Sequence, residues 1–213
     1  MKRLRVLLAD DHKIVAEGLR SLLEPEFEFA GIVEDGRALI KAAQKLLPDV
    51  IVADISMPLL NGIEAVRQIK ELNPDIKVVF LTMHPDVTYA ARAFEVGASG
   101  YVLKHSAPSE LVTAIHEAIK GRTYVTPMIA GELMQSYKEG SHLQQEGIGK
   151  LTPRQKEVLQ LLAEGHSAKE IADILCISPR TVEFHKYKMM EQLNVKTSAE
   201  LVGYAIKHGI VTV

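Results

Sequence analysis

The first 120 residues alternate short apolar runs with longer segments in which apolar residues recur every three or four positions. The apolar runs predict five strands, at residues 4–9, 27–33, 50–53, 77–81 and 100–103. The segments that follow them predict five helices, at residues 12–23, 37–46, 62–72, 86–96 and 108–120. Strands that alternate with helices predict an α/β fold, a (βα)5 doubly wound parallel sheet with helices on both faces.

Two of these strands, 50–53 and 78–81, contain only apolar residues, which is typical of strands buried on both faces. Pro48 and Pro74 follow predicted helices and precede the next strands. Because proline disfavours helical backbone in the residue before it, both positions support the predicted helix ends.

The periodic pattern weakens after residue 121, and the chain then becomes purely helical. Residues 122–148 are predicted to be an interdomain linker, helical in part near 127–137 and polar with glycines at 138–147. Thr152 and Pro153 then supply a helix cap and a first-turn proline. We therefore predict an α/β domain at 1–121 and a small all-α domain of about four helices at 149–213.

Composition excludes several classes of protein. Of 213 residues, 47% are apolar and 24% charged, as in ordinary soluble proteins. The single Cys176 cannot form an internal disulfide, and no apolar run is long enough to span a bilayer. The apolar stretch near the N-terminus stops at Asp10, too early for a signal peptide, so a cytoplasmic location is expected, without membrane association.

Net charge differs between the two parts of the chain. Residues 1–148 carry a net charge of −4 and residues 149–213 a net charge of +2. A mildly basic C-terminal part is compatible with DNA binding, although so small a difference is weak support on its own.

Polar side chains follow four of the predicted strands. Asp10 and Asp11 follow the first, Asp54 the third, Thr82 ends the fourth, and Lys104 follows the fifth. Ligands of open α/β sheets bind beyond the carboxyl ends of the strands, where these side chains converge. Clustered carboxylates repel one another and suit Mg²⁺, and one of them could attack a phosphoryl group. A single strand-end carboxylate is more often solvated or caps a helix, but chance does not explain the whole set.

The second domain contains a short helix, a tight turn and a longer helix. Apolar residues share one face of 168–175, Ser178 and Pro179 open the next helix, and 179–193 has charged residues off its apolar stripe. This arrangement predicts a helix-turn-helix. An ordinary helical bundle with a solvated charged face fits the spacing equally well.

The residues of the first domain resemble those of a response-regulator receiver domain. The resemblance is carried by segments 7–12 (LLADDH), 54–62 (DISMPLLNG), 81–82 (LT) and 101–104 (YVLK). It implies that Asp54 accepts a phosphoryl group from a sensor histidine kinase.

The same resemblance assigns roles to the neighbours of Asp54. It implies that Asp10, Asp11 and the backbone carbonyl of Ser56 bind Mg²⁺ together with Asp54. Thr82 and Tyr101 would form a switch pair, in which the threonine hydroxyl moves toward the phosphoryl group and the ring fills the vacated space. Lys104 would contact the phosphoryl group through its ammonium.

The second domain is similar to the LuxR-type DNA-binding domain. The similarity is carried by segments 151–159, 163–165, 169–172, 177–185, 193–195 and 199–201. The whole chain thus resembles a NarL/FixJ-type response regulator, which implies a transcription regulator that is not an enzyme, binds double-stranded DNA and acts as a homodimer. The predicted phosphate or base contacts are Arg180, Thr181, Glu183, His185, Lys186 and Lys188.

Helix phase separates these contacts into two kinds. Arg180 and Lys188 flank the groove-facing residues and are expected at phosphates, whereas Glu183 and Lys186 lie near the middle of one face and are expected at base edges. Glu183 could accept from a cytosine amino group or could repel the backbone.

The sequence leaves three questions open: the role of Met83, the role of the last helix, and two other functions for the chain. Met83 could shield an acyl phosphate from water, hinder phosphorylation or simply fill a gap. The last predicted helix, 198–208, could be the dimer contact or a plain bundle helix. The chain could also bind its partners without phosphorylation, or be an Asp-nucleophile phosphohydrolase, although such an enzyme needs a substrate-capping module in place of a DNA reader.

Overall fold

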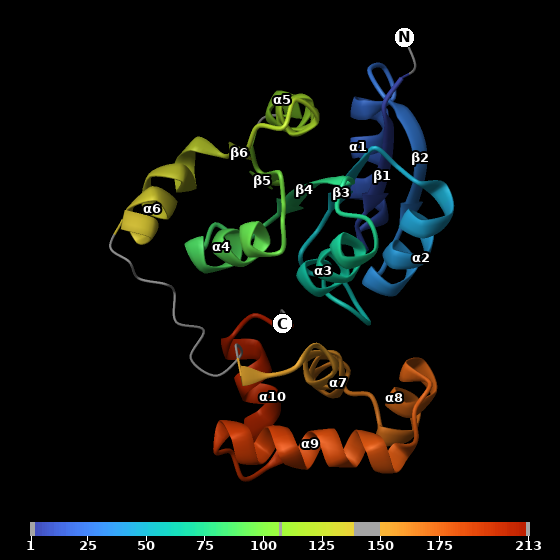
Figure 1. The fold of residues 1–213 in the computed structure, drawn as a ribbon, viewed down its shortest axis with the longest axis vertical. Coiled ribbons are helices and arrows are strands. Elements are labelled where there is room, and N and C mark those ends of the chain that lie inside the picture. Colours follow the sequence, from blue (N-terminus) through green and yellow to red (C-terminus); the bar gives the residue numbers. More distant parts are fainter. Residues whose placement is uncertain (1–2, 107, 139–149, 212–213) are drawn as a thin grey trace. The chain divides into compact units, whose positions relative to one another are not determined.

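A computed structural model describes residues 3–106, 108–138 and 150–211. The chain divides into two compact units, residues 1–58 with 62–143 and residues 59–61 with 144–213. The first unit contains a parallel sheet of six strands in the order β2-β1-β3-β4-β5-β6 (Figure 1). The strands are β1 (Arg5–Ala9), β2 (Glu28–Val33), β3 (Val50–Ala53), β4 (Lys77–Thr82), β5 (Gly100–Leu103) and β6 (Tyr124–Val125).

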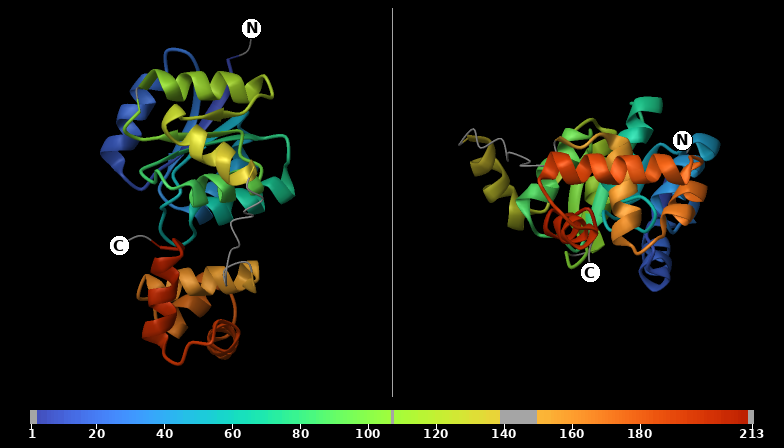
Figure 2. Two further views of the ribbon diagram at one scale, coloured as in Figure 1. Left: turned by 90° about the vertical axis from the view of Figure 1, so that its left-hand side faces the viewer. Right: turned by 90° about the horizontal axis from the view of Figure 1, so that it is seen from below.

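Helices cover both faces of this sheet. They are α1 (Lys13–Leu23), α2 (Gly36–Leu46), α3 (Gly62–Leu72), α4 (Val87–Glu95) and α5 (Pro108–Ile119), and a further helix, α6 (Pro127–Lys138), packs against α4. Helices α1 and α5 share one apolar core on one face, while α2, α3 and α4 lie on the other (Figures 1 and 2). All four residues of β3 are buried, because this strand is covered from both sides.

The predicted (βα)5 doubly wound sheet is confirmed, and the sixth strand was not predicted. Tyr124 and Val125 pair with Gly100 and Tyr101 of β5. A further backbone hydrogen bond follows this pairing, in which the Thr126 amide donates to the Tyr101 carbonyl at 3.0 Å. Two residues are too few to form an alternating pattern, so this strand left no periodic signal in the sequence.

The segment 122–148 contains more regular structure than a linker. Besides β6, it holds α6, which packs against α4. The helix expected near 127–137 is therefore present. Residues 139–149 lie outside the described part of the chain, so the domain boundaries at 121 and 149 stay predictions.

The second unit consists of helices α7 (Pro153–Ala163), α8 (Ala168–Leu175), α9 (Pro179–Leu193) and α10 (Ser198–Lys207). Thr152 and Ser167 form capping boxes with Gln155 and Glu170, and the Ser178 hydroxyl caps α9 by accepting from the Thr181 amide. The four predicted helices are confirmed, with the predicted breaks between them.

Apolar residues from all four helices form the core of this second unit. Val182 and Met189 are the fully buried residues of α9, and they pack with Ile171 of α8 and Leu201 of α10. The core side of α9 is therefore narrow, and much of its remaining surface faces solvent.

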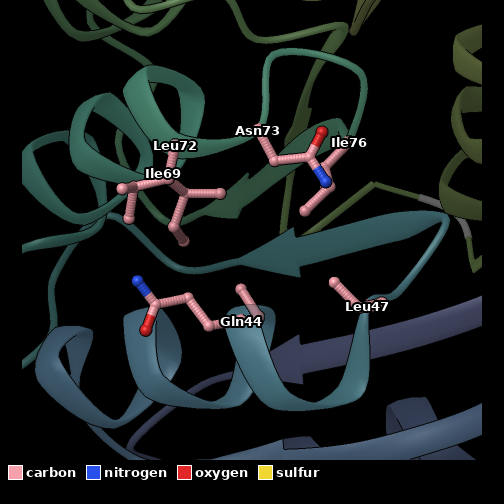
Figure 3. Close-up of a pocket in the computed structure, with 7 residues that line it drawn as sticks. Gln44, Leu47, Ile69, Leu72, Asn73 and Ile76 are labelled. Carbon is pink, nitrogen blue, oxygen red and sulfur yellow. The ribbon is translucent and has the colours of Figure 1, made fainter.

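A shallow pocket of about 320 Å³ lies between the C-terminal ends of α2 and α3 (Figure 3). Its lining is mainly aliphatic, with Gln44 and Asn73 as its polar residues, and it lies at the opposite end of the sheet from Asp54. Among the described residues, no helix has the length and hydropathy required to cross a bilayer.

Gly62 marks a close approach of backbone at the start of α3. Its amide donates to the Ile55 carbonyl at 2.8 Å, and a Cβ on this residue would overlap the backbone carbonyl of Asp54. The loop that carries Asp54 therefore requires a residue without a side chain here. Gly18, within α1, has open space around the position of a Cβ.

We expect Gly62→Ala to lower the free energy of unfolding by about 1–3 kcal/mol, because the added methyl group must displace backbone. Gly18→Ala is the matched control and should leave stability unchanged or raise it by up to about 1 kcal/mol, since alanine favours helix. Urea unfolding of both variants checks this. Equal effects of the two substitutions would contradict the close approach at Gly62.

Candidate functional site

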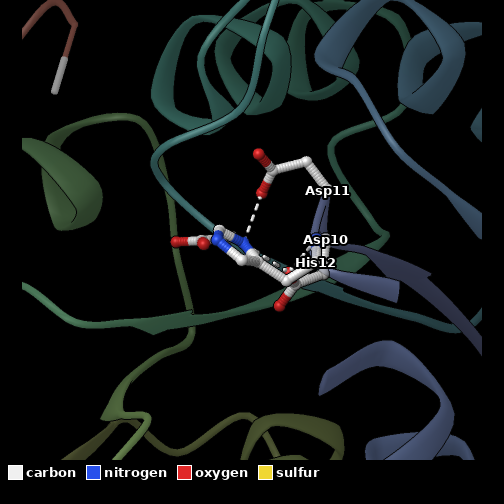
Figure 4. A group of neighbouring side chains, drawn as sticks. Asp10, Asp11 and His12 are labelled. Carbon is white, nitrogen blue, oxygen red and sulfur yellow. Dashed lines mark hydrogen bonds and ion pairs between the residues drawn. The ribbon is translucent and has the colours of Figure 1, made fainter. Parts of the chain in front are cut away.

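The first unit gathers acidic side chains at the carboxyl ends of its central strands. Asp10, Asp11, His12 and Asp54 each offer one ligand atom, and these atoms lie within 4.8 Å of one another. Figure 4 shows Asp10, Asp11 and His12 as neighbours at the end of β1. The structure thus brings together the three carboxylates that the sequence analysis singled out.

Parallel pairing sets the positions of these carboxylates. Ala9 of β1 pairs with Ala53 of β3, so the next residues, Asp10 and Asp54, follow at the same edge. The Asp54 amide donates to the Ala9 carbonyl at 2.8 Å, which continues the ladder one residue further. Asp10 and Asp54 are both buried.

Lys104 supplies positive charge to the buried carboxylates. Its Nζ lies 2.6 Å from Oδ2 of Asp54 and 2.7 Å from Oδ2 of Asp10. Burial acts to lower the pKa of Lys104, but the two ion pairs outweigh burial and raise it. The lysine therefore stays protonated and bridges the two carboxylates.

Asp54 has one oxygen toward Lys104 and the other toward backbone amides. Its Oδ1 accepts from the amides of Ile55 at 2.6 Å and Ser56 at 3.3 Å. Burial raises the pKa of Asp54, Lys104 opposes that shift, and nearby Asp10 adds to it. The carboxylate is fixed in orientation, and a further cation near it would favour its charged form.

Asp11 provides the second indication of a cation site. Its Oδ1 is shielded from solvent and accepts no hydrogen bond within the described part of the chain. His12 Nδ1 lies 2.8 Å away (Figure 4), within ion-pair distance, but makes no hydrogen bond to this oxygen. A buried carboxylate oxygen without a donor, beside two other carboxylates, fits a hard divalent cation with oxygen ligands.

The predicted switch residues lie next to this cluster. Thr82 is fully buried, and its Oγ1 accepts from the His84 amide at 3.3 Å. Tyr101 is also fully buried, and its hydroxyl donates to the His84 carbonyl at 2.8 Å. Burial raises the pKa of the Tyr101 hydroxyl, so this hydroxyl remains a donor.

His84 is a residue that the sequence analysis missed. Its Nε2 lies 2.8 Å from the Ser56 hydroxyl, and its ring stacks on Tyr89 at 4.3 Å between centroids. Burial lowers the pKa of His84, which favours the neutral ring. Because the contact joins the loop after β3 to the loop after β4, no local pattern in the sequence could reveal it.

Met83 occupies a different environment from the one that gap filling requires. Its side chain is 61% exposed. It therefore fills no interior space, and two alternatives remain for this residue: it shields an acyl phosphate from water, or it hinders phosphorylation.

In the second unit, α8 and α9 form the helix-turn-helix. Arg154 of α7 donates to the Leu175 carbonyl at the end of α8 at 2.7 Å and pairs with Glu157 at 2.8 Å. The left-handed backbone of Cys176 ends α8, and Ser178 then caps α9. The Arg154 contact thus joins α7 to the end of α8, and Cys176 and Ser178 define the turn between α8 and α9.

The six predicted DNA contacts all lie on α9. Arg180 and Lys188 are exposed, while Thr181, Glu183 and His185 are partly exposed. Lys186 forms an ion pair with Glu183, in which its Nζ lies 2.6 Å from Oε2, and its side chain is 17% exposed. Burial lowers the pKa of His185, with Arg154 and Lys188 adding to the shift, so its ring is neutral near pH 7. The individual contacts stay predictions.

Phe184 and Tyr187 are exposed residues of α9 that the sequence analysis did not consider as contacts. Their exposed fractions are 59% and 64%. Their position off the buried stripe of Val182 and Met189 could be read from the sequence, but only polar side chains of this helix were predicted as DNA contacts.

Helix α10 contributes Leu201 and Ala205 to the core of its own unit, as a bundle helix does. Ile206 on the same helix is 42% exposed. A dimer contact along this helix stays a prediction.

Comparisons with known proteins identify both units. The family model "Response regulator receiver domain" matches residues 6–116, and "Bacterial regulatory proteins, luxR family" matches residues 149–205. The chain is 34% identical to the transcriptional regulatory protein DegU of Brevibacillus brevis, over 99% of this chain and 96% of DegU.

Solved structures of RcsB are similar along the whole chain. RcsB of Salmonella enterica serovar Typhimurium, bound to a promoter in the presence of the phosphomimetic BeF3−, is 31% identical with a TM-score of 0.62, over 95% of this chain and 98% of that chain. Another structure, of two RcsB dimers on two parallel DNAs, is 31% identical with a TM-score of 0.60, over 99% of this chain and 100% of that chain.

Proposed function

Because the chain belongs to the two-component response regulators with a LuxR-type DNA-binding domain, we propose that phosphorylation of Asp54 by a sensor histidine kinase controls its binding to DNA. This family binds DNA and regulates transcription, and it is not enzymatic. The observation that carries the proposal is the pair of contacts from Lys104 to Asp54 and Asp10 beside the donor-free oxygen of Asp11.

The geometry around Asp54 suits attack on a phosphoryl group. Its carboxylate is held by the Ile55 and Ser56 amides, which orients one oxygen for attack. The Lys104 ammonium lies where charge accumulates on the transferred group and can move from the carboxylate to a phosphoryl oxygen. Transfer forms a bond between an Asp54 oxygen and phosphorus and breaks the bond between phosphorus and the donor's histidine nitrogen.

We propose that Asp10, Asp11, Asp54 and the Ser56 carbonyl hold Mg²⁺. Such a cation supplies charge neutralisation to the phosphoryl oxygens. The chain's own carboxylates already lie together, so little rearrangement is needed to form the site.

The switch is proposed to start at Thr82. A phosphoryl group on Asp54 offers a strong acceptor, and the Thr82 hydroxyl can turn toward it. His84 connects this movement to the surface, because its amide contacts Thr82 and its carbonyl accepts from Tyr101. Its ring stacks on Tyr89 of α4, so a shift of this loop displaces α4.

The surface beside the acidic cluster suits a protein as phosphoryl donor. Ile14 on α1 is 91% exposed, and a pocket of about 390 Å³ between α1 and α5 is lined mainly by apolar residues. Lys104 lines the same pocket. Exposed apolar surface of this kind is typical of a protein contact, which supports the sensor kinase as the partner.

The second unit is proposed to bind double-stranded DNA through α9, as a homodimer on paired half-sites. The predicted contacts are Arg180, Thr181, Glu183, His185, Lys186 and Lys188. A dimer matches the spacing of half-sites about one helical turn apart. A cytoplasmic location belongs to the proposal, because the exposed thiol of Cys176 suits a reducing compartment.

We expect Asp54→Asn to abolish labelling of the chain by acetyl phosphate and Mg²⁺, because the amide is a poor nucleophile. Asp11→Asn should weaken the Mg²⁺ dependence of labelling by removing one ligand. The measurement is the mass increase of the intact chain. Asp75→Asn, an exposed carboxylate at the opposite end of β4, is the matched control and should label normally. Full labelling of Asp54→Asn would place the acceptor elsewhere.

DNA affinity should fall steeply with salt, because phosphate contacts supply most of it. Lys188→Ala should weaken binding to selected and random duplexes equally and reduce the slope of log K against log salt by about one. Lys186→Ala is the comparison, and should cost about 1–3 kcal/mol on a selected duplex and less on random DNA. Competition titrations measure both. If Lys188→Ala lost selectivity for the selected duplex and Lys186→Ala kept it, Lys188 would be the base contact and Lys186 the phosphate contact.

A further inference from the structure

Two large aromatic side chains lie on the solvent side of α9. Phe184 is 59% exposed and Tyr187 is 64% exposed, and they are three residues apart on the helix. Residues three apart are neighbours on one helical face. The core face of α9 is already formed by Val182 and Met189, so these aromatic rings do not contribute to the folded core of the unit.

Cations surround this aromatic face. Lys188 Nζ lies 5.7 Å from the centroid of Phe184, and Lys186 Nζ lies 5.3 Å from the centroid of Tyr187. Arg180 is exposed one turn before Phe184. An apolar centre with cations at its margins is complementary to a DNA groove, where phosphates line the rims and bases form the floor.

The polar side chains of the same helix are less available to the bases. Lys186 is paired with Glu183 at 2.6 Å, so contact of either side chain with a base edge requires that this pair open. The Thr181 hydroxyl lies 2.9 Å from that of Ser178 at the helix cap. Phe184 and Tyr187 are already exposed and need no such rearrangement.

An aromatic ring recognises one particular group in the major groove. The thymine C5 methyl is the apolar group that base edges present there, and phenylalanine is among the side chains that contact it. We propose that Phe184 and Tyr187 add to sequence specificity by contacting thymine methyl groups, with Arg180 and Lys188 at the flanking phosphates.

This inference rests on the proposed DNA binding and adds the chemistry of base recognition. It is tested with the full chain, treated with acetyl phosphate and Mg²⁺, and with duplexes that this chain enriches from a random-sequence library. Each thymine of an enriched duplex is replaced in turn by uracil, which removes the methyl group and keeps every hydrogen-bonding group.

We expect one or two uracil positions per half-site to reduce affinity on the order of fourfold each, the effect of losing contact with one buried methyl-sized group. Phe184→Ala should bind the thymine and uracil duplexes equally at one of these positions, and Tyr187→Ala at another. Phe184→Leu should keep part of the preference for thymine. Because both rings are exposed, thermal unfolding should be nearly unchanged, and measuring it confirms that the variants are folded.

Lys188→Ala is the matched control, because it should weaken both duplexes and keep the ratio between them. Equal binding of thymine and uracil duplexes by the unmodified chain would overturn the inference while leaving DNA binding intact. Unchanged DNA binding by Phe184→Ala and Tyr187→Ala would also overturn it, and would indicate a protein-contact surface. Absence of any salt-dependent DNA affinity would instead overturn the proposed function itself.

Discussion

The buried contact of Lys104 with Asp54 and Asp10 is the interaction on which the first unit's chemistry depends. Two carboxylates at the ends of adjacent buried strands repel each other, and burial raises the free energy of their charged forms. One ammonium between them offsets this repulsion, while Oδ1 of Asp11 accepts no hydrogen bond from the described residues. The site therefore retains excess negative charge, which suits a divalent cation and then a phosphoryl group.

The same burial explains how a change at Asp54 can reach the surface. Thr82 and Tyr101 are enclosed and cannot move without displacing neighbours, and both contact the backbone of His84. His84 in turn stacks on Tyr89 of α4. In the proposed switch, a local change in hydrogen bonding would move this loop and helix, because packed interiors deform little.

Sequence periodicity predicted strands β1 to β5 and the helices. The meeting of Asp10, Asp11 and Asp54 followed from the fold, since parallel strands place their carboxyl ends at one edge of the sheet. Periodicity could not predict β6, whose two residues pair through backbone alone. The contact of His84 with Ser56 was not predicted, because the two residues lie in different loops. Phe184 was missed for a different reason, because only polar and charged side chains of this helix were predicted as DNA contacts. Contacts between distant segments require the folded chain.

The central claim is that phosphorylation at Asp54 controls DNA binding. Its most direct test is the affinity of the full chain for a duplex enriched from a random library, measured with and without acetyl phosphate and Mg²⁺, in the unmodified chain and in Asp54→Asn. The account predicts that treatment raises the affinity of the unmodified chain and leaves that of Asp54→Asn unchanged. Equal affinities of the treated and untreated chain, or an equal response of Asp54→Asn, would contradict it.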